Sequence, residues 1–222
     1  LAQSSRGITP QPQDCDLTFL HPLTIDSEFT RDIDDGLSVQ RMGNELQVGI
    51  HITDVATYLN GFAEIFREAM ARATSIYLPD QRIPMIPPAL SEGACSLIVG
   101  EKRRALSFLV RFDGEGRVLE YRIVPSIIQV ERRLSYDQVD SLLEEMDEEL
   151  TLLKGISEKL GRRRTEMGAF FIPRPERVIR VNREKEIILY KRDRESPSQK
   201  MVSEFMILAN SLAALFLKGR EV

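Results

Sequence analysis

The chain has 222 residues, of which 42% are hydrophobic and 29% are charged, and its formal net charge at pH 7 is −4. This composition is typical of a globular protein and excludes collagen-like, low-complexity and fully disordered chains. The net charge does not support a nonspecific nucleic-acid coat protein, which would usually be basic, although a local basic groove is compatible with it.

Residues 1–15 are polar, with two prolines and several glutamines and serines, and they predict a flexible lead-in or linker. The domain itself is then expected over residues 16–222. The chain begins with Leu1 instead of Met, so we expect it to be part of a longer protein. Cys15 and Cys95 lie in no metal-binding spacing, and we expect reduced thiols in a cytoplasmic protein.

The first half of the chain predicts short strands and one helix. Residues 17–25 fit a strand, and a hairpin with strands at residues 37–40 and 46–52 follows. Apolar residues alternate in the second of these strands, which predicts one buried face. The remaining elements are a helix with one apolar stripe at residues 61–73, a β-like stretch at 74–78, and an irregular loop with four prolines at 79–88.

The second half predicts two more hairpins and three helices. The hairpins cover residues 105–124, with an extension at 126–130, and residues 177–190. Ser135 and Gln138 have the spacing of a capping box, and they predict a helical region that runs to residue 165 with a break near Met146. The last helix is expected over residues 196–218, with Gly219 at its C-cap. Because hairpins outnumber strand–helix–strand units, the predicted class is α+β, a mostly antiparallel sheet with packed helices.

The most apolar stretch is residues 205–217. It contains Asn210 and Ser211 and is shorter than the run of about 18 apolar residues that a membrane span requires. We therefore interpret it as a buried helix and expect no membrane association.

Four aspartates crowd into a short segment: Asp26, Asp32, Asp34 and Asp35. Carboxylates about 4 Å apart repel each other by about 4 kcal/mol at an effective dielectric constant of about 20. A divalent cation removes this repulsion, and short carboxylates suit Mg²⁺ or Mn²⁺. Two such ions can hold the attacking water and the leaving oxygen of a phosphodiester.

Two alternatives compete with a metal site. The segment is also compatible with an exposed acidic loop rich in turn-forming residues. A calcium loop of the EF-hand type fits poorly, because counting from Asp32 puts Gly36 at position five and Gly43 at position twelve.

Several motifs in order resemble the catalytic domain of the ribonuclease II and ribonuclease R family, also called the RNB domain. Each motif is weak alone, but their common order and spacing from about residue 16 to residue 214 is specific. The matching stretches are Asp26 with Asp32–Asp35, Val48–Val55, Thr74–Pro79, Ile83–Pro87, Ser91 with Cys95–Leu97, Leu134–Tyr136, and Glu204 with Met206–Asn210.

This resemblance implies a 3′-to-5′ hydrolytic exoribonuclease that degrades single-stranded RNA to 5′-nucleoside monophosphates by a two-metal mechanism with Mg²⁺ or Mn²⁺. It implies Asp26 and Asp35 as first-metal ligands, and Asp32 and Asp34 as catalytic residues that complete the metal centre. Asp34 is expected to be the least replaceable.

The resemblance also implies RNA contacts by Tyr77, Tyr136 and Glu204. Without it, both tyrosines fit half-buried aromatics and Glu204 fits a polar residue on the exposed side of an apolar helix. His51, on an alternating strand, is interpreted as a structural, hydrogen-bonded histidine.

The family domain continues past the end of this sequence to a segment whose arginine contacts the scissile phosphate, and it is flanked by OB-type cold-shock and S1 modules. The chain is therefore expected to be the N-terminal part of the catalytic domain. Two other functions stay open: a non-catalytic RNA- or protein-binding module on the same fold, and an inert fragment that binds Mg²⁺ without cleavage.

Overall fold

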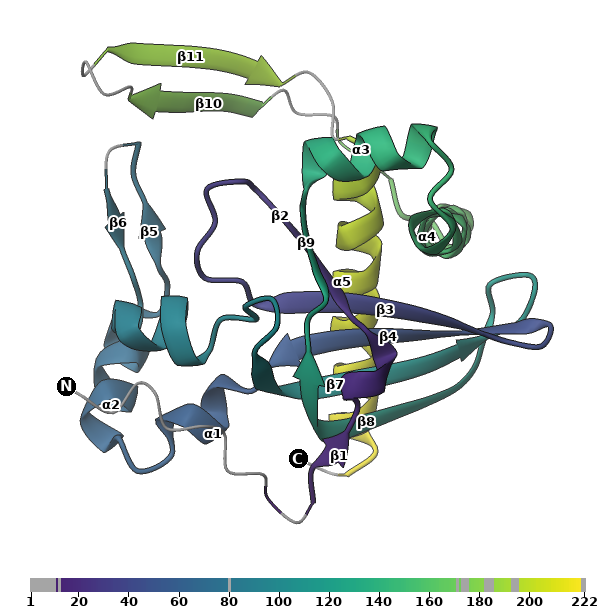
Figure 1. Cartoon of the computed structure of the whole chain (residues 1–222), viewed down its shortest axis with the longest axis horizontal. Helices are drawn as coiled ribbons and strands as arrows, with labels where there is room; N and C mark the ends of the chain where they lie inside the picture. Colours follow the sequence, from purple (N-terminus) through teal and green to yellow (C-terminus); the bar gives the residue numbers. More distant parts are fainter. Residues whose placement is uncertain are drawn as a thin grey trace.

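A seven-stranded sheet forms the centre of the computed structural model, which describes residues 11 and 13–220 except 80, 171, 173–175, 182–185 and 193–195. The strand order is β1-β8-β7-β4-β3-β2-β9 (Figure 1). The outer pairs β1–β8 and β2–β9 are parallel and the other pairs are antiparallel, so the predicted α+β class is confirmed. The strands are β1 (Cys15–Asp16), β2 (Leu23–Asp26), β3 (Asp35–Met42), β4 (Glu45–Thr53), β7 (Lys102–Phe112), β8 (Val118–Gln129) and β9 (Arg132–Ser135).

Two predicted hairpins form the middle of the sheet. β3 and β4 pair from Asp35 opposite Ile52 to Met42 opposite Glu45, and Gly43 closes the turn with φ +65°. A two-residue hairpin turn requires this positive φ, which glycine adopts without strain. β7 and β8 form the second hairpin, and β8 extends to Gln129 as predicted.

The helices begin where the sequence predicts caps. Helices α3 (Tyr136–Glu144) and α5 (Pro197–Lys218) both start with complete capping boxes, from Ser135 with Gln138 and from Ser196 with Gln199. Met146, with φ +62°, separates α3 from α4 (Glu148–Glu166), which confirms the predicted break. The shorter helices are α1 (Val55–Leu59) and α2 (Ala63–Arg72), and a π-helical turn covers Ala89–Ala94.

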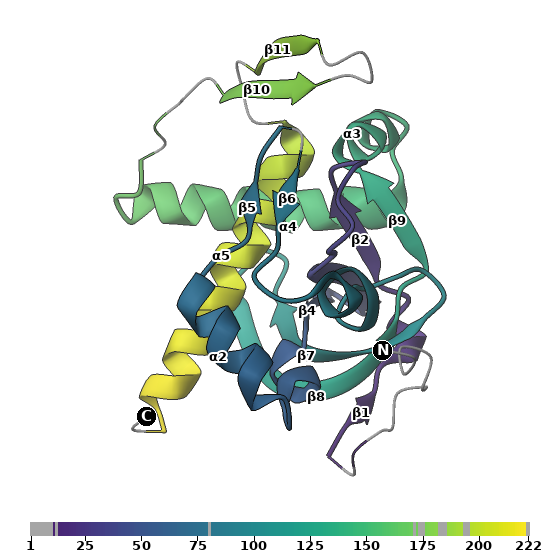
Figure 2. The ribbon, with the colours of Figure 1, turned by 90° about the vertical axis from the view of Figure 1, so that its left-hand side faces the viewer.

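Both faces of the sheet are buried. Helices α3, α4 and α5 lie on one side of it (Figure 2), where side chains such as Ile50, Phe112, Leu153 and Phe205 form the main core. A second core on the other face includes Leu20, Ile33, Leu97 and Ile128. The prediction of a single buried face for β4 was therefore incomplete, because Gly49 and His51 on its other face are buried too.

The N-terminal segment differs from the prediction. Residues 17–25 are interrupted by a 3₁₀ turn at Thr18–Leu20 and by His21 in the left-handed conformation, so only Leu23–Asp26 forms a strand in this stretch. Residues 1–10 of the predicted lead-in lie outside the described residues. Its last residues belong to the fold, because Cys15 pairs with Ser126 and Asp14 forms a buried ion pair with Arg104.

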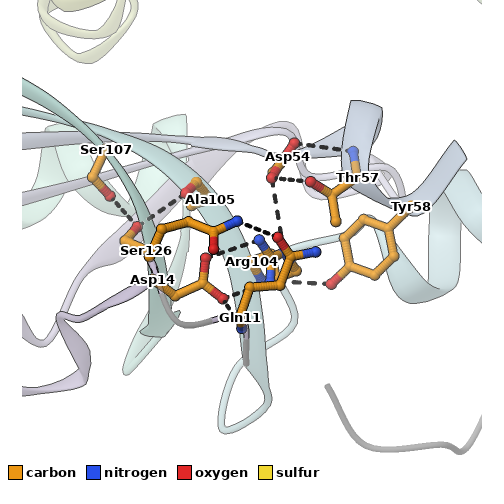
Figure 3. A network of polar contacts seen from close by, with 10 residues as sticks. Gln11, Asp14, Asp54, Thr57, Tyr58, Arg104, Ala105, Ser107 and Ser126 are labelled. Atoms are coloured by element: carbon orange, nitrogen blue, oxygen red, sulfur yellow. Dashed lines mark hydrogen bonds and ion pairs between the residues drawn. The ribbon is translucent and has the colours of Figure 1, made fainter. Parts of the chain in front are cut away.

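This ion pair holds the segment at Asp14 against β7 (Figure 3). Arg104 donates from Nη1 and Nη2 to the two carboxylate oxygens of Asp14 at 2.5 and 2.8 Å, and its Nε lies 3.7 Å from Asp54. The side chains of Arg104 and Asp14 are 6% and 1% exposed. A buried pair of this kind contributes little net stability, but breaking it by removing one partner costs about 3–5 kcal/mol.

Helix α5 is less buried than the sequence predicts. Its buried residues, including Met201, Phe205 and Leu212, pack into the core, but Leu215 and Leu217 are exposed. Among the described residues it is also the one helix whose length and hydropathy would suffice to cross a membrane, a test that core helices of soluble proteins also pass. Its buried face supports the interpretation as a core helix.

Two small hairpins complete the fold. β5 (Ile76–Tyr77) pairs with β6 (Arg82–Ile83), and β10 (Glu176–Val181) pairs with β11 (Ile187–Arg192). Both views show them outside the main sheet (Figures 1 and 2). The β10–β11 pairing confirms the third predicted hairpin, whose turn lies outside the described residues.

Candidate active site

The four aspartates lie at the end of two neighbouring strands and in the segment between them. Asp26 is the last residue of β2, and Asp35 is the first residue of β3. Asp32 and Asp34 lie in the connecting segment, where the buried Ile33 separates them and anchors the chain in the second core. Neither Asp32 nor Asp34 lies within a strand.

Three of these carboxyl groups have raised pKa values. Burial, reinforced by the charges of Asp26 and Asp34, raises the pKa of Asp35 to about 7. Burial also raises the pKa of Asp26 to about 6, against the opposing charge of Arg133 and together with the charges of Asp34 and Asp32. The pKa of Asp34 is raised by loss of surrounding water and then by Asp32. The carboxylates of this trio therefore repel one another, and the charge of Arg133 offsets the effect only in part.

Asp32 has partners of its own. The Tyr77 hydroxyl donates to Asp32 Oδ2 at 2.6 Å, and Arg82 Nη1 donates to Asp32 Oδ1 at 2.7 Å. Arg82 also donates from Nη2 to Glu92, which in turn lies 3.7 Å from the Arg31 guanidinium. Burial and the hydrogen bond to Asp32 raise the pKa of Tyr77 to about 12, so its hydroxyl stays protonated.

These side chains border an open pocket of about 560 Å³. Phe29 and Tyr77 contribute two aromatic rings that are 66% and 65% exposed. The pocket thus combines aromatic surfaces with a carboxylate of the acidic segment. Its lining residues are Ser27, Phe29, Thr30, Arg31, Asp32, Tyr77, Leu78, Gln81, Arg82 and Glu92.

The aspartates have the chemistry of a metal site, but their side chains are not yet arranged as one. In the part of the chain that the structure describes, no three Asp, Glu, His or Cys side chains form a group ready to hold a metal. However, Asp26 Oδ2 is buried and has no hydrogen-bond partner. An unpartnered carboxylate oxygen beside two other crowded carboxylates is a donor set that suits a hard divalent cation.

The other two predicted RNA-binding residues lie outside the pocket lining. Tyr136, half-buried at the start of α3, packs against the main core, and it directly follows Ser135, which pairs with Asp26 across β2 and β9. Glu204 on α5 accepts two hydrogen bonds from Arg164 on α4, at 3.0 and 2.8 Å. The structure therefore gives Glu204 an interhelical ion pair, and the RNA contacts of both residues stay predictions.

The structural interpretation of His51 is confirmed. Its ring is fully buried between Ser38 Oγ at 3.0 Å and Ser107 Oγ at 2.7 Å, and burial lowers its pKa to about 4. Gly49 makes room for it, because a Cβ at Gly49 would lie 2.5 Å from His51 Nε2 and would also clash with Ser38. Cys15 and Cys95 are free thiols, as predicted.

Sequence reasoning missed Arg82 and Glu92, which belong with Tyr77 to the polar cluster at Asp32. Arg82 lies in the proline-rich stretch that was predicted to be an irregular loop, and Glu92 lies in the following turn. The contact of Arg82 with Asp32 spans 50 residues of the chain, and no local pattern signals it. Glu92 joins the cluster through its hydrogen bond from Arg82. Phe29 could have been suspected as an isolated aromatic residue within an acidic segment.

Comparison with known proteins agrees with this fold. The RNB domain matches residues 15–222, and the chain therefore belongs to the RNB-domain family. It is 39% identical over 211 residues to an uncharacterized ribonuclease of Synechocystis, covering 93% of this chain and 32% of that protein. It is 34% identical over 204 residues to ribonuclease R of Thermotoga maritima, covering 86% of this chain and 29% of that protein.

Solved structures of Mycoplasma genitalium RNase R have the same fold. The structure with ribose-methylated single-stranded RNA has a TM-score of 0.89, and the one with double-stranded RNA has a TM-score of 0.90. Both are 28% identical to the chain and cover 96% of it, which corresponds to 34% and 39% of those chains. The chain thus spans about a third of the curated relatives that it matches.

Proposed function

We propose that the chain is the metal-binding part of a 3′-to-5′ exoribonuclease that hydrolyses single-stranded RNA to 5′-nucleoside monophosphates with Mg²⁺ or Mn²⁺. Membership of the RNB family and similarity to ribonuclease R support the reaction class. The observation that carries the proposal is the acidic trio Asp26, Asp34 and Asp35, which has raised pKa values and an unpartnered buried oxygen. We expect the whole protein to be cytoplasmic, like a soluble RNA-degrading enzyme.

The trio would hold the cation. When bound, Mg²⁺ supplies Lewis-acid activation of the phosphodiester and neutralises the charge that develops on it. Asp26 and Asp35 come from strand ends and are fixed by the sheet, so they would anchor the ion. Asp34 reaches the surface of the site, where it would face both the ion and the substrate. Asp32 would complete the acidic centre from the side of the pocket.

The pocket supplies a place for the RNA end next to these carboxylates. Stacking of a base on an exposed aromatic ring is worth about 1–3 kcal/mol and does not depend on base identity. Tyr77 and Phe29 present such rings at the pocket. This arrangement suits an enzyme that degrades RNA without sequence preference, and Tyr136 and Glu204 would contact the strand elsewhere.

The test is the cleavage of 5′-labelled single-stranded RNA with Mg²⁺ by this chain and by a longer parent chain that includes the rest of the domain. We expect a ladder of shortening products and released mononucleotides, both lost in Asp34→Asn. If the parent chain releases no mononucleotides, the proposal fails.

Two alternative functions predict different results in the same assay. A non-catalytic binding module would retain RNA equally well when the divalent ions are chelated. An inert fragment would bind Mg²⁺ in calorimetry, yet only the parent chain would cleave.

A further inference from the structure

A small cluster of polar side chains joins the β5–β6 hairpin to the acidic segment. We call it the Arg82 bridge: Asp32, Tyr77, Arg82 and Glu92. The Arg82 side chain is 19% exposed, and those of Asp32 and Glu92 are 9% and 25% exposed. The guanidinium also lies 6.0 Å from the centre of the Tyr77 ring. One arginine thus contacts two carboxylates and an aromatic ring from its position at the start of β6.

Little apolar packing fixes the position of the hairpin. Its strands are two residues each, and an isolated hairpin of this size has marginal stability in water. The apolar side chains of Ile76, Leu78 and Ile83 are more than 40% exposed, so they contribute little packing. In the described part of the chain, the side chains of Tyr77 and Arg82 donate the hydrogen bonds that join residues 76–83 to the acidic segment.

Arginine suits this role better than lysine. A guanidinium presents several N–H donors in a fixed plane, so one side chain can bond two carboxylates at once. In the structure Nη1 donates to Asp32 and Nη2 donates to Glu92. A lysine ammonium has no comparable planar geometry and would favour one carboxylate over the other.

We propose that Arg82 is a positioning residue, which fixes the Asp32 carboxylate in the pocket wall and, through it, holds the ring of Tyr77 at the mouth of the pocket. Arg82 then affects RNA binding through Tyr77 and not by contacting the RNA. This role rests on the proposed function only in its second part, the effect on RNA.

The first measurement is hydrogen exchange of the hairpin amides in the full chain without divalent ions. We expect Arg82→Gln and Asp32→Asn each to accelerate exchange in residues 76–83 at least tenfold. The double variant should exchange within about twofold of the faster single variant, because both changes break one interaction. Arg82→Lys should restore only part of the protection.

A matched control is available on β7. Arg111 also bridges two carboxylates, Glu45 at 3.2 Å and Glu120 at 3.3 Å, on strands of the main sheet. Arg111→Gln should leave the exchange of residues 76–83 unchanged. Unchanged exchange in Arg82→Gln, or equal acceleration in Arg111→Gln, would overturn the positioning role.

The second measurement is the affinity for a single-stranded adenosine oligonucleotide in a chelating buffer. We expect Tyr77→Ala and Arg82→Gln each to weaken binding about tenfold, and the double variant to bind no more weakly than Tyr77→Ala. A further tenfold loss in the double variant would mean that Arg82 contacts RNA directly and would refute the proposal. If Tyr77→Ala has no effect on affinity, the RNA role of Tyr77 fails, while hydrogen exchange still decides whether Arg82 positions the hairpin.

Discussion

The acidic trio should make the stability of the metal-free chain depend on pH. A carboxyl group whose folded pKa is raised holds a proton that the unfolded chain has already released. Its contribution to the free energy of unfolding is therefore complete below the unfolded pKa, near 3.8, and is lost as pH rises through the folded pKa. For Asp35 this window runs from about pH 4 to about pH 7, and for Asp26 it ends near pH 6.

The magnitude follows from the size of the shift. About three pKa units at 1.36 kcal/mol per unit correspond to about 4 kcal/mol for Asp35. Partial exposure and the repulsion that Asp35 shares with Asp26 reduce the measurable effect to about 2–3 kcal/mol. For a chain of this length that is a decrease in Tm of about 5–10 °C.

Other groups titrate in the same range, so the effect must be measured as a difference between variants. Burial raises the pKa of Glu149 to about 7, which adds a loss of the same sign. The lowered pKa of His51 acts in the opposite direction, because the unfolded histidine gains its proton first as pH falls below about 6.5. Both contributions cancel when the original chain is compared with Asp35→Asn.

The assay is calorimetric unfolding with a chelator at half-unit intervals from pH 5 to pH 8. The Tm of the original chain should fall relative to that of Asp35→Asn as pH rises, and excess Mg²⁺ at pH 8 should remove most of the difference. Asp137→Asn, an exposed aspartate in the first turn of α3, serves as a control that should not change the profile. Parallel profiles for the original chain and Asp35→Asn would refute the electrostatic reasoning.

Three further changes have defined outcomes. Gly49→Ala should lower the free energy of unfolding by about 1–3 kcal/mol, because the new methyl group meets the His51 ring and the core cannot expand freely. Urea unfolding measures this loss, and an unchanged midpoint would contradict the clash. Asp14→Asn should lower the free energy of unfolding by about 3–5 kcal/mol, because it leaves the buried Arg104 charge with only its 3.7 Å contact to Asp54. A loss below 1 kcal/mol in the same measurement would show that water or Asp54 compensates the guanidinium. Asp34→Asn should keep the Tm within about 2 °C while it abolishes RNA cleavage by the parent chain, a prediction that fails if cleavage persists.

Local signals predicted most of the fold. The capping box at Ser135 and the tight turn of the first hairpin act over a few residues, so a single sequence reveals them. The sequence did not predict the outer strands β1 and β9, because each pairs in parallel with a strand far away in the sequence and has no local partner. Helical periodicity revealed the apolar stripe of α2 but not its environment: Phe62, Phe66 and Met70 are exposed in the described chain.

In the candidate site, too, the sequence reveals the charged residues but not their partners. A cluster of aspartates is visible in any sequence, but whether each carboxylate is paired depends on the residues that folding brings to it. The fold places Arg82 and Tyr77 on Asp32 and leaves Asp26 Oδ2 without a partner. It therefore compensates Asp32 with hydrogen bonds from its own side chains, whereas only the more distant charge of Arg133 opposes the repulsion at Asp26.

This asymmetry favours our proposal of a cation site over the alternative of an exposed acidic loop. In an exposed loop, water would screen every carboxylate and the pKa values would stay near 3.8. Here burial and mutual repulsion raise the pKa values of Asp26 and Asp35 by two units or more, which is a cost to the metal-free fold. A sequence that keeps such a cost beside a pocket with exposed aromatic rings is consistent with selection for binding a cation next to a substrate. The dependence of Tm on pH and Mg²⁺ therefore tests the site itself, before any RNA is added.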